Sequence, residues 1–275
     1  MPYKGYNISV RGASHITKDM VCQDYSGFIC SDNYSIAVVS DGHGGDRHFR
    51  SETGAKSAVD VSLEAVKELI ANENDFLPDI AQNYPKVLRQ LAGCICARWV
   101  DAVVTHFGEN PITESEKNFY ETYYLYDNSE TEINITAMYG ATLIVSVITP
   151  AYNFVIQTGD GACAIIQQDG KCYIPPATID DRLYGGYTTS LCDSNALDNF
   201  RFYYSQNIPK AIMLSTDGVV DSYNKEDFIK FNKTLYNLFL TNYDQAYFNL
   251  SEWLPKLSAR GSKDDMSVAG IYCIE

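Results

Sequence analysis

Aspartate residues recur where apolar, strand-like runs of this sequence end or begin. The runs and their aspartates are "VVSDGHGG" with Asp41, "VIQTGDGA" with Asp160, "IMLSTDGVVD" with Asp217 and Asp221, "RGSKDDMSV" with Asp264 and Asp265, and "MVCQDYSG" with Asp24. A single Asp-Gly dipeptide is typical of a surface turn. Repetition of the pattern, with no competing cluster of histidines or cysteines, instead favours an all-oxygen site for a hard divalent cation. Carboxylates, a backbone carbonyl and water suit Mg²⁺ or Mn²⁺, whereas zinc favours imidazole or thiolate ligands.

His43 is the one histidine inside these motifs. Two divalent cations a few ångströms apart can activate a bridging water and stabilise an in-line displacement at phosphorus. An imidazole beside them, which titrates near neutrality, could protonate a departing alkoxide. The alternative is an ordinary turn histidine, and the local sequence leaves both roles open. Glycine next to Asp41 would let the backbone approach an ion closely.

The elements that must position these residues are strands, then helices, then further strands. Apolar residues recur at helical spacing over 46–71 and 84–107, and 226–258 also has helical character. Residues 108–135 form a polar and acidic excursion rich in tyrosine, and 175–200 has the Gly, Asp, Thr and Asn content of a surface segment. Strands before and after the helices, without alternating βαβ units, predict an α+β fold with antiparallel sheets.

The composition excludes several classes of protein. Lysine and arginine number 21 against 35 aspartates and glutamates, which gives a net charge of −14. Such a charge repels phosphate backbones and anionic lipids, so we expect neither nucleic acid nor a membrane as partner. No apolar run reaches the length of a bilayer span, and the opening "MPYKGYNISV" lacks the apolar core of a secretion signal. Eight cysteines without a CxxC pair predict buried thiols in a reducing compartment, hence a cytoplasmic protein.

Five motifs, in this order, resemble those of the metal-dependent Ser/Thr protein phosphatases of type 2C, the PPM family. They are "VVSDGHGG", "GATLIVSV", "TGDGACAII", "LSTDGVVD" and "GSKDDMSV", and the "SH…CQD" opening is similar to the bacterial and phage branch. The resemblance spans nearly the whole chain and implies a single phosphatase domain over 1–275. It implies a four-layer α-β-β-α sandwich of two antiparallel β-sheets flanked by helices. A two-metal centre would lie at one end, with a flap-like segment at about 175–200.

The resemblance also implies roles residue by residue. Asp41 matches the carboxylate that bridges both metals, Gly42 the backbone-carbonyl ligand, Asp217 and Asp264 the remaining ligands of the first metal, Asp24 the carboxylate that holds metal-bound water, and Asp160 the ligand of a weaker third metal that Asp217 and Asp221 complete. His43 matches the general acid. Asp265, where relatives often carry asparagine, is the less favoured ligand of its pair. The implied cofactors are two Mg²⁺ or Mn²⁺ ions and a weaker third.

One part of the family's pattern is missing. Relatives place an arginine a few residues before the acidic pair to bind the substrate phosphate, but "SHITKDMVCQD" contains none. Arg11 lies further upstream, and His15 and Lys18 are the other candidates for this role.

The resulting prediction is a phosphoprotein phosphatase in which a metal-bridging water attacks phosphoserine or phosphothreonine and His43 protonates the departing oxygen. Its partners would be phosphoprotein substrates and a cognate Ser/Thr kinase. Two alternatives stay open: a catalytically silent relative that binds a partner, and a hydrolase of small phosphoesters with the same centre. Retention of every metal-ligand position weighs against the silent relative.

Overall fold

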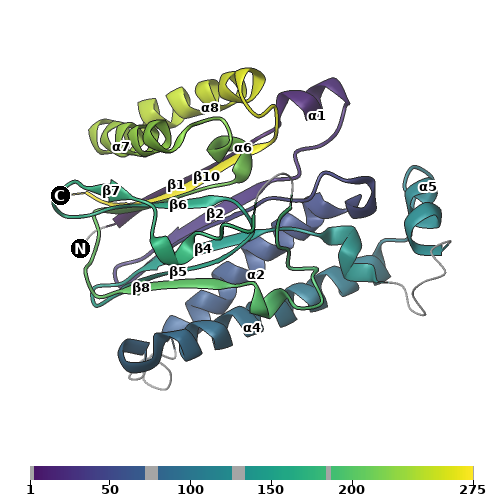
Figure 1. Cartoon of the computed structure of the whole chain (residues 1–275), viewed down its shortest axis with the longest axis horizontal. Helices are drawn as coiled ribbons and strands as arrows, with labels where there is room; N and C mark the ends of the chain where they lie inside the picture. Colours follow the sequence, from purple (N-terminus) through teal and green to yellow (C-terminus); the bar gives the residue numbers. More distant parts are fainter. Residues whose placement is uncertain (1–2, 72–79, 126–133, 184–186, 275) are drawn as a thin grey trace.

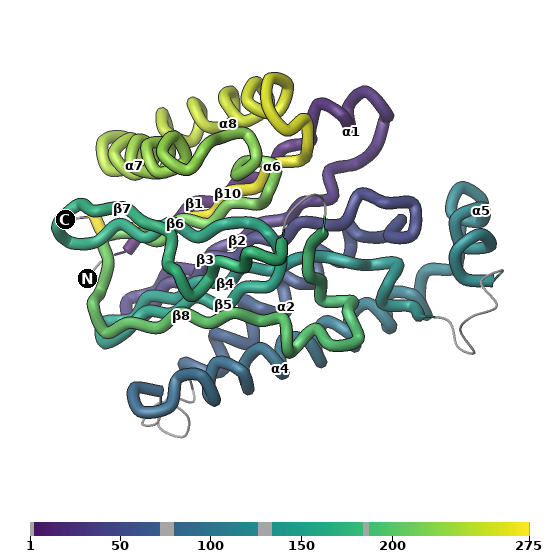
Figure 2. The backbone as a smooth tube through the Cα atoms, viewed as in Figure 1, coloured from purple at the N-terminus to yellow at the C-terminus, as the bar shows by residue number. Residues whose placement is uncertain are grey.

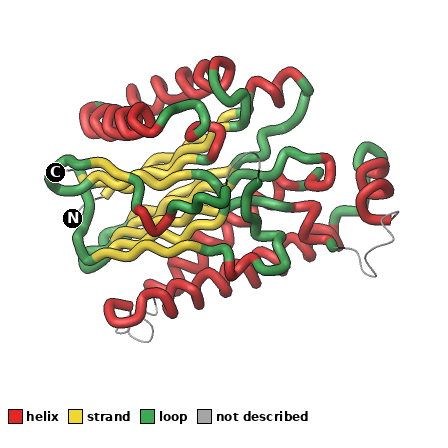
Figure 3. Tube along the Cα trace, in the orientation of Figure 1, coloured by secondary structure: helices red, strands yellow, loops and turns green. Residues whose placement is uncertain are grey.

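Two five-stranded antiparallel sheets pack face to face in the computed structural model of the chain (Figure 1). The structure describes residues 3–71, 80–125, 134–183 and 187–274. The first sheet has the strand order β1-β10-β9-β6-β7, and the second has the order β2-β3-β4-β5-β8. Figure 3 shows the helices, in red, against the outer faces of the two layers of strands. The predicted four-layer α-β-β-α sandwich is confirmed.

The strands follow the apolar runs of the sequence. Their bounds are β1 Tyr3–Val10, β2 Tyr25–Cys30, β3 Ser35–Ser40, β4 Leu143–Ile148, β5 Asn153–Thr158, β6 Ala162–Ile166, β7 Cys172–Tyr173, β8 Arg201–Ser205, β9 Ala211–Ser215 and β10 Met266–Cys273. The first and last strands pair along their whole length, from Tyr3 opposite Cys273 to Val10 opposite Met266. Figure 2 shows this pairing as the purple and yellow ends of the chain lying side by side.

Helices cover the outer face of each sheet. Their bounds are α1 Ala13–Thr17, α2 Ser51–Ala71, α4 Ile80–Glu109, α5 Lys117–Tyr120, α6 Asp217–Val220, α7 Lys225–Thr241 and α8 Tyr243–Arg260. Short 3-10 turns occupy η1 Asp46–His48, η3 Ile135–Tyr139, η4 Pro176–Thr178 and η5 Ala196–Asp198, and η2 Glu121–Leu125 is π-helical. The long helices α2 and α4 lie against the second sheet, and α7 and α8 lie against the first (Figure 1).

Alternation of side chains explains why the central strands are buried on both faces. In β3, Ile36 and Val38 pack toward α2 and α4, whereas Ala37 and Val39 face the other sheet. Successive side chains of a strand point to opposite faces, so a continuous apolar run fills two cores at once. The chain therefore has three hydrophobic layers: one under each helical pair and one between the sheets.

The helix predicted over 46–71 begins later, at Ser51. A 3-10 turn precedes it, and the Arg50 N–H donates 2.9 Å to the Met138 carbonyl instead of continuing a helical ladder backwards. The helix predicted over 84–107 corresponds to α4, whose backbone leaves the helical region at Asn83 (φ −144°, ψ 50°). Pro85 follows that break, where its missing N–H costs no helical hydrogen bond.

The helical stretch predicted over 226–258 consists of two helices. Asn242 is extended (φ −159°), ends α7, and accepts a 3.1 Å hydrogen bond from the Gln245 N–H at the start of α8. An asparagine N-cap satisfies one of the free N–H groups of a helix start, which fixes the boundary between the two helices. The apolar spacing of the sequence indicates the amphipathic faces of both helices, but it does not indicate the boundary between them.

Part of the tyrosine-rich excursion at 108–135 folds into α5 and η2, and 126–133 lie outside the described residues. All eight cysteines are free thiols; Cys163 and Cys273 are buried, five are half-buried, and Cys94 is exposed on α4, so the prediction of buried thiols is wrong for Cys94. No helix in the described ranges has both the length and the apolar character needed to cross a membrane.

Candidate metal centre and active-site cavity

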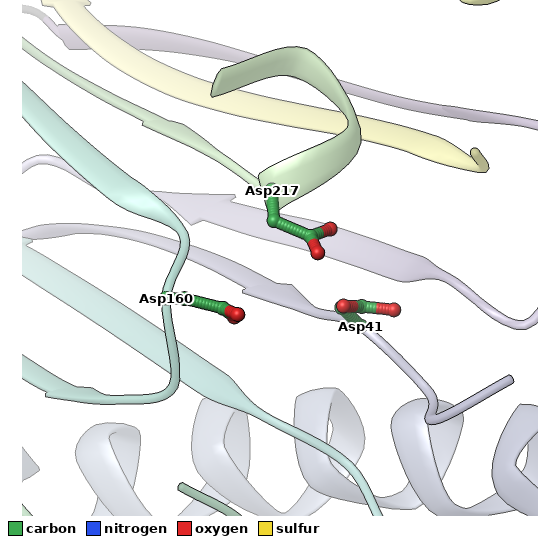
Figure 4. A group of neighbouring side chains, drawn as sticks. All are labelled: Asp41, Asp160 and Asp217. Carbon is green, nitrogen blue, oxygen red and sulfur yellow. The ribbon is translucent and has the colours of Figure 1, made fainter. Parts of the chain in front are cut away.

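Three strand-end aspartates, Asp41, Asp160 and Asp217, converge at one place in the sandwich. Asp41 directly follows β3, Asp160 lies in the turn after β5, and Asp217 begins α6 after β9. Each offers one carboxylate oxygen, and these oxygens lie within 4.8 Å of one another. Figure 4 shows the three side chains entering the same space from three separate elements. Carboxylate oxygens gathered in this way suit a hard divalent cation.

Other predicted ligands border this cluster. Asp264, just before β10, lines the same cavity. Asp24 is 4% exposed, and the Thr216 hydroxyl donates a 2.7 Å hydrogen bond to its Oδ2, while no described residue bonds its Oδ1. Asp221 is exposed one turn after Asp217 and is not among the described residues that line the cavity. Asp24 therefore keeps a buried oxygen available for a water or an ion.

Asp41, Asp217 and Asp24 resist ionisation because they are buried close to other carboxylates. Burial, followed by the charges of Asp160 and Asp264, raises the pKa of Asp217 to about 7. Burial first, then the neighbouring carboxylates, raises the pKa of Asp41 well above its usual range, and burial does the same for Asp24. A carboxylate crowded by like charges gains from a cation that neutralises it. The donor set and its electrostatics therefore fit divalent metal ions.

Gly42 fits a space that no larger residue could occupy. It is buried, and a Cβ at this position would lie 2.6 Å from the Gln23 carbonyl oxygen and 2.7 Å from that of Ser51. The preceding Asp41 is held by Thr142, whose N–H donates 2.8 Å to the Asp41 carbonyl and whose Oγ1 accepts 3.1 Å from the Asp41 N–H. The backbone at 41–42 is therefore fixed on both sides.

His43 stands beside the acidic cluster in contact with a second histidine. The rings of His43 and His48 are 4.9 Å apart and nearly perpendicular, and the His48 Nδ1 contacts the Ala137 carbonyl. Burial, then the charge of His48, lowers the pKa of His43 to about 4. Gly140 admits this pair, because a Cβ there would lie 2.6 Å from His43 Cδ2 and 2.7 Å from His48 Nδ1. His43 is thus neutral near pH 7 in this structure, and a phosphate dianion beside it would favour its protonated form.

A cavity of about 700 Å³ opens onto the aspartates and the histidine pair. Its lining residues are Asp41, Gly42, His43, Gly44, Gly45, Arg47, His48, Asn134, Ala137, Asp160, Tyr187, Thr188, Ser190, Cys192, Asp193, Ser194, Asp217 and Asp264. The predicted flap-like segment contributes six of these residues, from Tyr187 to Ser194, and 184–186 lie outside the described residues.

The family model described as Protein phosphatase 2C matches residues 11–256. The chain belongs to the protein phosphatase 2C family. No match was found among curated protein sequences.

Solved structures share the phosphatase 2C fold over the full chain. A variant of a bacterial serine phosphatase is 14% identical, with a TM-score of 0.58 and 100% of both chains covered. The catalytic domain of the serine/threonine protein phosphatase PstP with two manganese ions is 14% identical, with a TM-score of 0.54, 100% of this chain and 99% of that chain covered. RsbX with magnesium is 12% identical, with a TM-score of 0.50, 98% of this chain and 95% of that chain covered. At these identities the similarity shows the fold.

The predicted phosphate-binding candidates of this phosphatase 2C member, Arg11, His15 and Lys18, are all absent from the described residues that line the cavity. Arg11 is exposed, and its Nη1 donates 3.1 Å to the Met20 carbonyl. His15 is buried, and its Nδ1 lies 2.8 Å from Asp265 Oδ2. Arg11 and His15 are near Asp24 in the sequence. In the structure their side chains contact Met20 and Asp265 and so stabilise the segment before Asp24.

Asp265 anchors that segment instead of facing the cavity. It is 2% exposed, its Oδ1 accepts 2.6 Å from the Gly12 N–H, and its Oδ2 accepts 2.6 Å from the Gln23 N–H. A Cβ on Gly12 would lie 2.2 Å from the Asp264 backbone, so only glycine admits this approach. Asp265 therefore ties the segment before Asp24 to the start of β10, beside Asp264.

Arg50, which motif reasoning missed, fixes the far end of the loop that begins at Asp41. Its side chain is 5% exposed, and the Nε and Nη2 donate 2.7 and 2.9 Å to the two carboxylate oxygens of Glu116. The remaining N–H groups donate to the carbonyls of Asn110 and Pro111 and to the Tyr139 hydroxyl. An arginine followed by a predicted amphipathic helix carries no sequence signal of this role.

Arg201 supports the turn that carries Asp160. Its side chain is 11% exposed, its Nη2 donates to the Gly159 carbonyl, and its Nη1 lies 3.5 Å from Asp180 Oδ2. Asp180 also accepts hydrogen bonds from Arg182. The predicted flap-like segment is therefore connected to the Asp160 turn through a buried guanidinium.

Proposed function

We propose that this chain is a metal-dependent phosphoprotein phosphatase that hydrolyses phosphoserine and phosphothreonine and works as one catalytic domain. The observation that carries the proposal is the group of Asp41, Asp160 and Asp217 oxygens within 4.8 Å of one another, beside His43, in an open cavity. Membership of the phosphatase 2C family over residues 11–256 supports the reaction class.

The residues divide into ligands and a proton donor. Asp41, the Gly42 carbonyl, Asp217 and Asp264 would hold two Mn²⁺ or Mg²⁺ ions, and Asp24 would hold a water coordinated to them. Asp160 and Asp221 would serve with Asp217 at a weaker third site. When bound, such cations act as Lewis acids that lower the pKa of coordinated water and neutralise phosphate charge.

His43 would hold the proton that the departing serine or threonine oxygen needs. Its ring is positioned by His48 and by the close approach of Gly140. An alkoxide is a poor leaving group, so protonation matters most for alkyl phosphates and least for aryl phosphates.

The test is a Mn²⁺- and Mg²⁺-dependent assay on phosphoserine and phosphothreonine peptides and on a small aryl phosphate. Asp41→Asn should reduce turnover to background, whereas Asp169→Asn, in the exposed β6–β7 turn, should leave it unchanged. His43→Ala should slow peptide hydrolysis by about 10²-fold or more and aryl phosphate hydrolysis much less.

Calorimetric metal binding without turnover on any substrate would contradict the proposal and favour a silent relative. Turnover of the aryl phosphate alone would favour a hydrolase of small phosphoesters. An equal effect of His43→Ala on both substrate classes would contradict the proton-donor role.

A further inference from the structure

The cavity that holds the acidic cluster also presents a guanidinium that pairs with no residue of the described ranges. Arg47 is exposed, and no described residue forms an ion pair or a hydrogen bond with its side chain. The other lining residues of the described chain carry no arginine or lysine. Among the described lining residues, Arg47 therefore carries the permanent positive charge of a cavity that also contains Asp41, Asp160, Asp217 and Asp264.

The backbone of Arg47 is held, although its side chain bonds to none of the residues that the structure describes. The residue lies in the 3-10 turn η1, and its carbonyl accepts a 2.6 Å hydrogen bond from the Tyr124 hydroxyl of η2. The following residues are fixed by the His48 ring contact and by the buried Arg50. A free guanidinium on an anchored backbone is a side chain prepared for an external anion.

The position of Arg47 along the wall indicates which anion it meets. His43 follows Asp41 and Gly42, the His48 ring lies 4.9 Å from the His43 ring, and Arg47 directly precedes His48. Arg47, His48 and Cys192 line the same cavity, and the charge of Arg47, after burial, lowers the pKa of His48 and also acts on Cys192, so the guanidinium lies near the part of the cavity that these two residues line. A phosphoryl group held at the aspartates would leave Arg47 to a neighbouring part of the substrate.

We infer that Arg47 is a specificity-determining residue that binds an acidic side chain near the phosphorylated residue of the substrate. An extended peptide advances about 3.3 Å per residue, so a side chain a few positions from the phosphorylated one reaches this part of the cavity. The bidentate pairing of guanidinium with carboxylate supplies both affinity and orientation. The inference rests on the proposed phosphatase function and names the substrate class that the site prefers.

The experiment compares three substrates: a phosphoserine peptide with glutamates at the flanking positions, the same peptide with alanines there, and an aryl phosphate. Arg47→Ala should raise KM for the acidic peptide by about threefold to tenfold, with kcat and the other two substrates little changed. Arg47→Lys keeps the positive charge but loses the bidentate guanidinium, so its KM for the acidic peptide should lie between those of the wild type and Arg47→Ala. Arg98→Ala is the matched control, because Arg98 pairs with Glu68 on the α2–α4 surface.

A second readout needs no turnover. Fluorescence anisotropy would measure binding of the labelled peptides, in Mn²⁺, to Asp41→Asn with and without Arg47→Ala. If the wild-type protein shows no turnover, the phosphatase proposal is contradicted, but the anisotropy comparison still decides the role of Arg47. Equal weakening of all three substrates by Arg47→Ala would overturn the inference, because the anion would then be the scissile phosphate. No weakening of the acidic peptide, or a KM effect from Arg11→Ala in its place, would overturn it as well.

Discussion

The adjacent residues Asp264 and Asp265 should respond to substitution in opposite ways. Asp265 is 2% exposed and accepts two 2.6 Å hydrogen bonds from backbone N–H groups, besides its 2.8 Å contact with His15. Hydrogen bonds to a charged group contribute about 1.5–3 kcal/mol each, and Asp265 would lose both of its bonds from backbone N–H groups. Asp265→Ala should therefore lower the free energy of unfolding by about 3–5 kcal/mol. In a chain of this size that lowers Tm by about 10 °C.

Asp264→Asn should leave the metal-free protein as stable as the wild type or more so. Burial, then the neighbouring charges, raises the pKa of Asp264, so the folded protein gains when one negative charge of the cluster is removed. The asparagine oxygen can still accept the 2.9 Å hydrogen bond from the Asp265 N–H. Metal at 100 times its Kd stabilises the folded state by about 2.7 kcal/mol, and this gain should shrink in Asp264→Asn.

Thermal unfolding followed by circular dichroism, in chelator and in Mn²⁺, measures both effects. Asp265→Asn should be intermediate, because one amide oxygen replaces one carboxylate oxygen while the NH₂ group faces the second backbone donor. A loss below about 1 kcal/mol in Asp265→Ala would refute the anchoring role. Equal destabilisation of both variants in chelator would refute the division of roles between the two aspartates.

Two further predictions concern buried guanidinium groups. Burial disfavours ionisation of Glu116, but the hydrogen bonds from Arg50 outweigh it and lower its pKa to about 2. The folded state then binds fewer protons than the unfolded state, so this stabilisation is complete above about pH 4.5 and is lost as the pH falls toward 2. Urea unfolding should show Glu116→Gln less stable by about 1–3 kcal/mol at pH 7, with the difference shrinking below pH 4.5; a constant difference would contradict the linkage. Arg201→Met removes the anchor of the Gly159–Asp160 turn and should weaken Mn²⁺ binding by about tenfold in calorimetry, whereas unchanged affinity would contradict the supporting role.

The layered architecture could be predicted because its signals are local or motif-based. Apolar runs marked the strands, and the ordered motifs implied the sandwich that the structure contains. The partners of each strand could not be derived from the runs themselves. β1 pairs with β10 at the far end of the chain, and nothing in "YNISV" distinguishes that neighbour from β2. Helix ends were missed where a single contact decides them, as with Arg50 and Asn242.

The candidate site divides along the same line. Aspartates at strand ends can be recognised in the sequence, and the structure brings Asp41, Asp160 and Asp217 together. The phosphate-binding candidates Arg11, His15 and Lys18 were chosen by their position along the chain before Asp24, and in the fold His15 contacts Asp265. Arg47 went unnoticed because the pattern after the glycines favoured a helix surface over a cavity wall.

The geometry of "DGHGG" depends on residues that the motif does not contain. Gly42 must be glycine because a Cβ would clash with the backbone of Gln23 and Ser51. The His43 ring fits beside Gly140 because Gly140 has no side chain. A motif identifies ligands because ligand chemistry limits residue type, whereas the surrounding wall depends on shape, which many residue types can provide. Selectivity among substrates should therefore vary through wall residues such as Arg47 while the aspartates stay fixed.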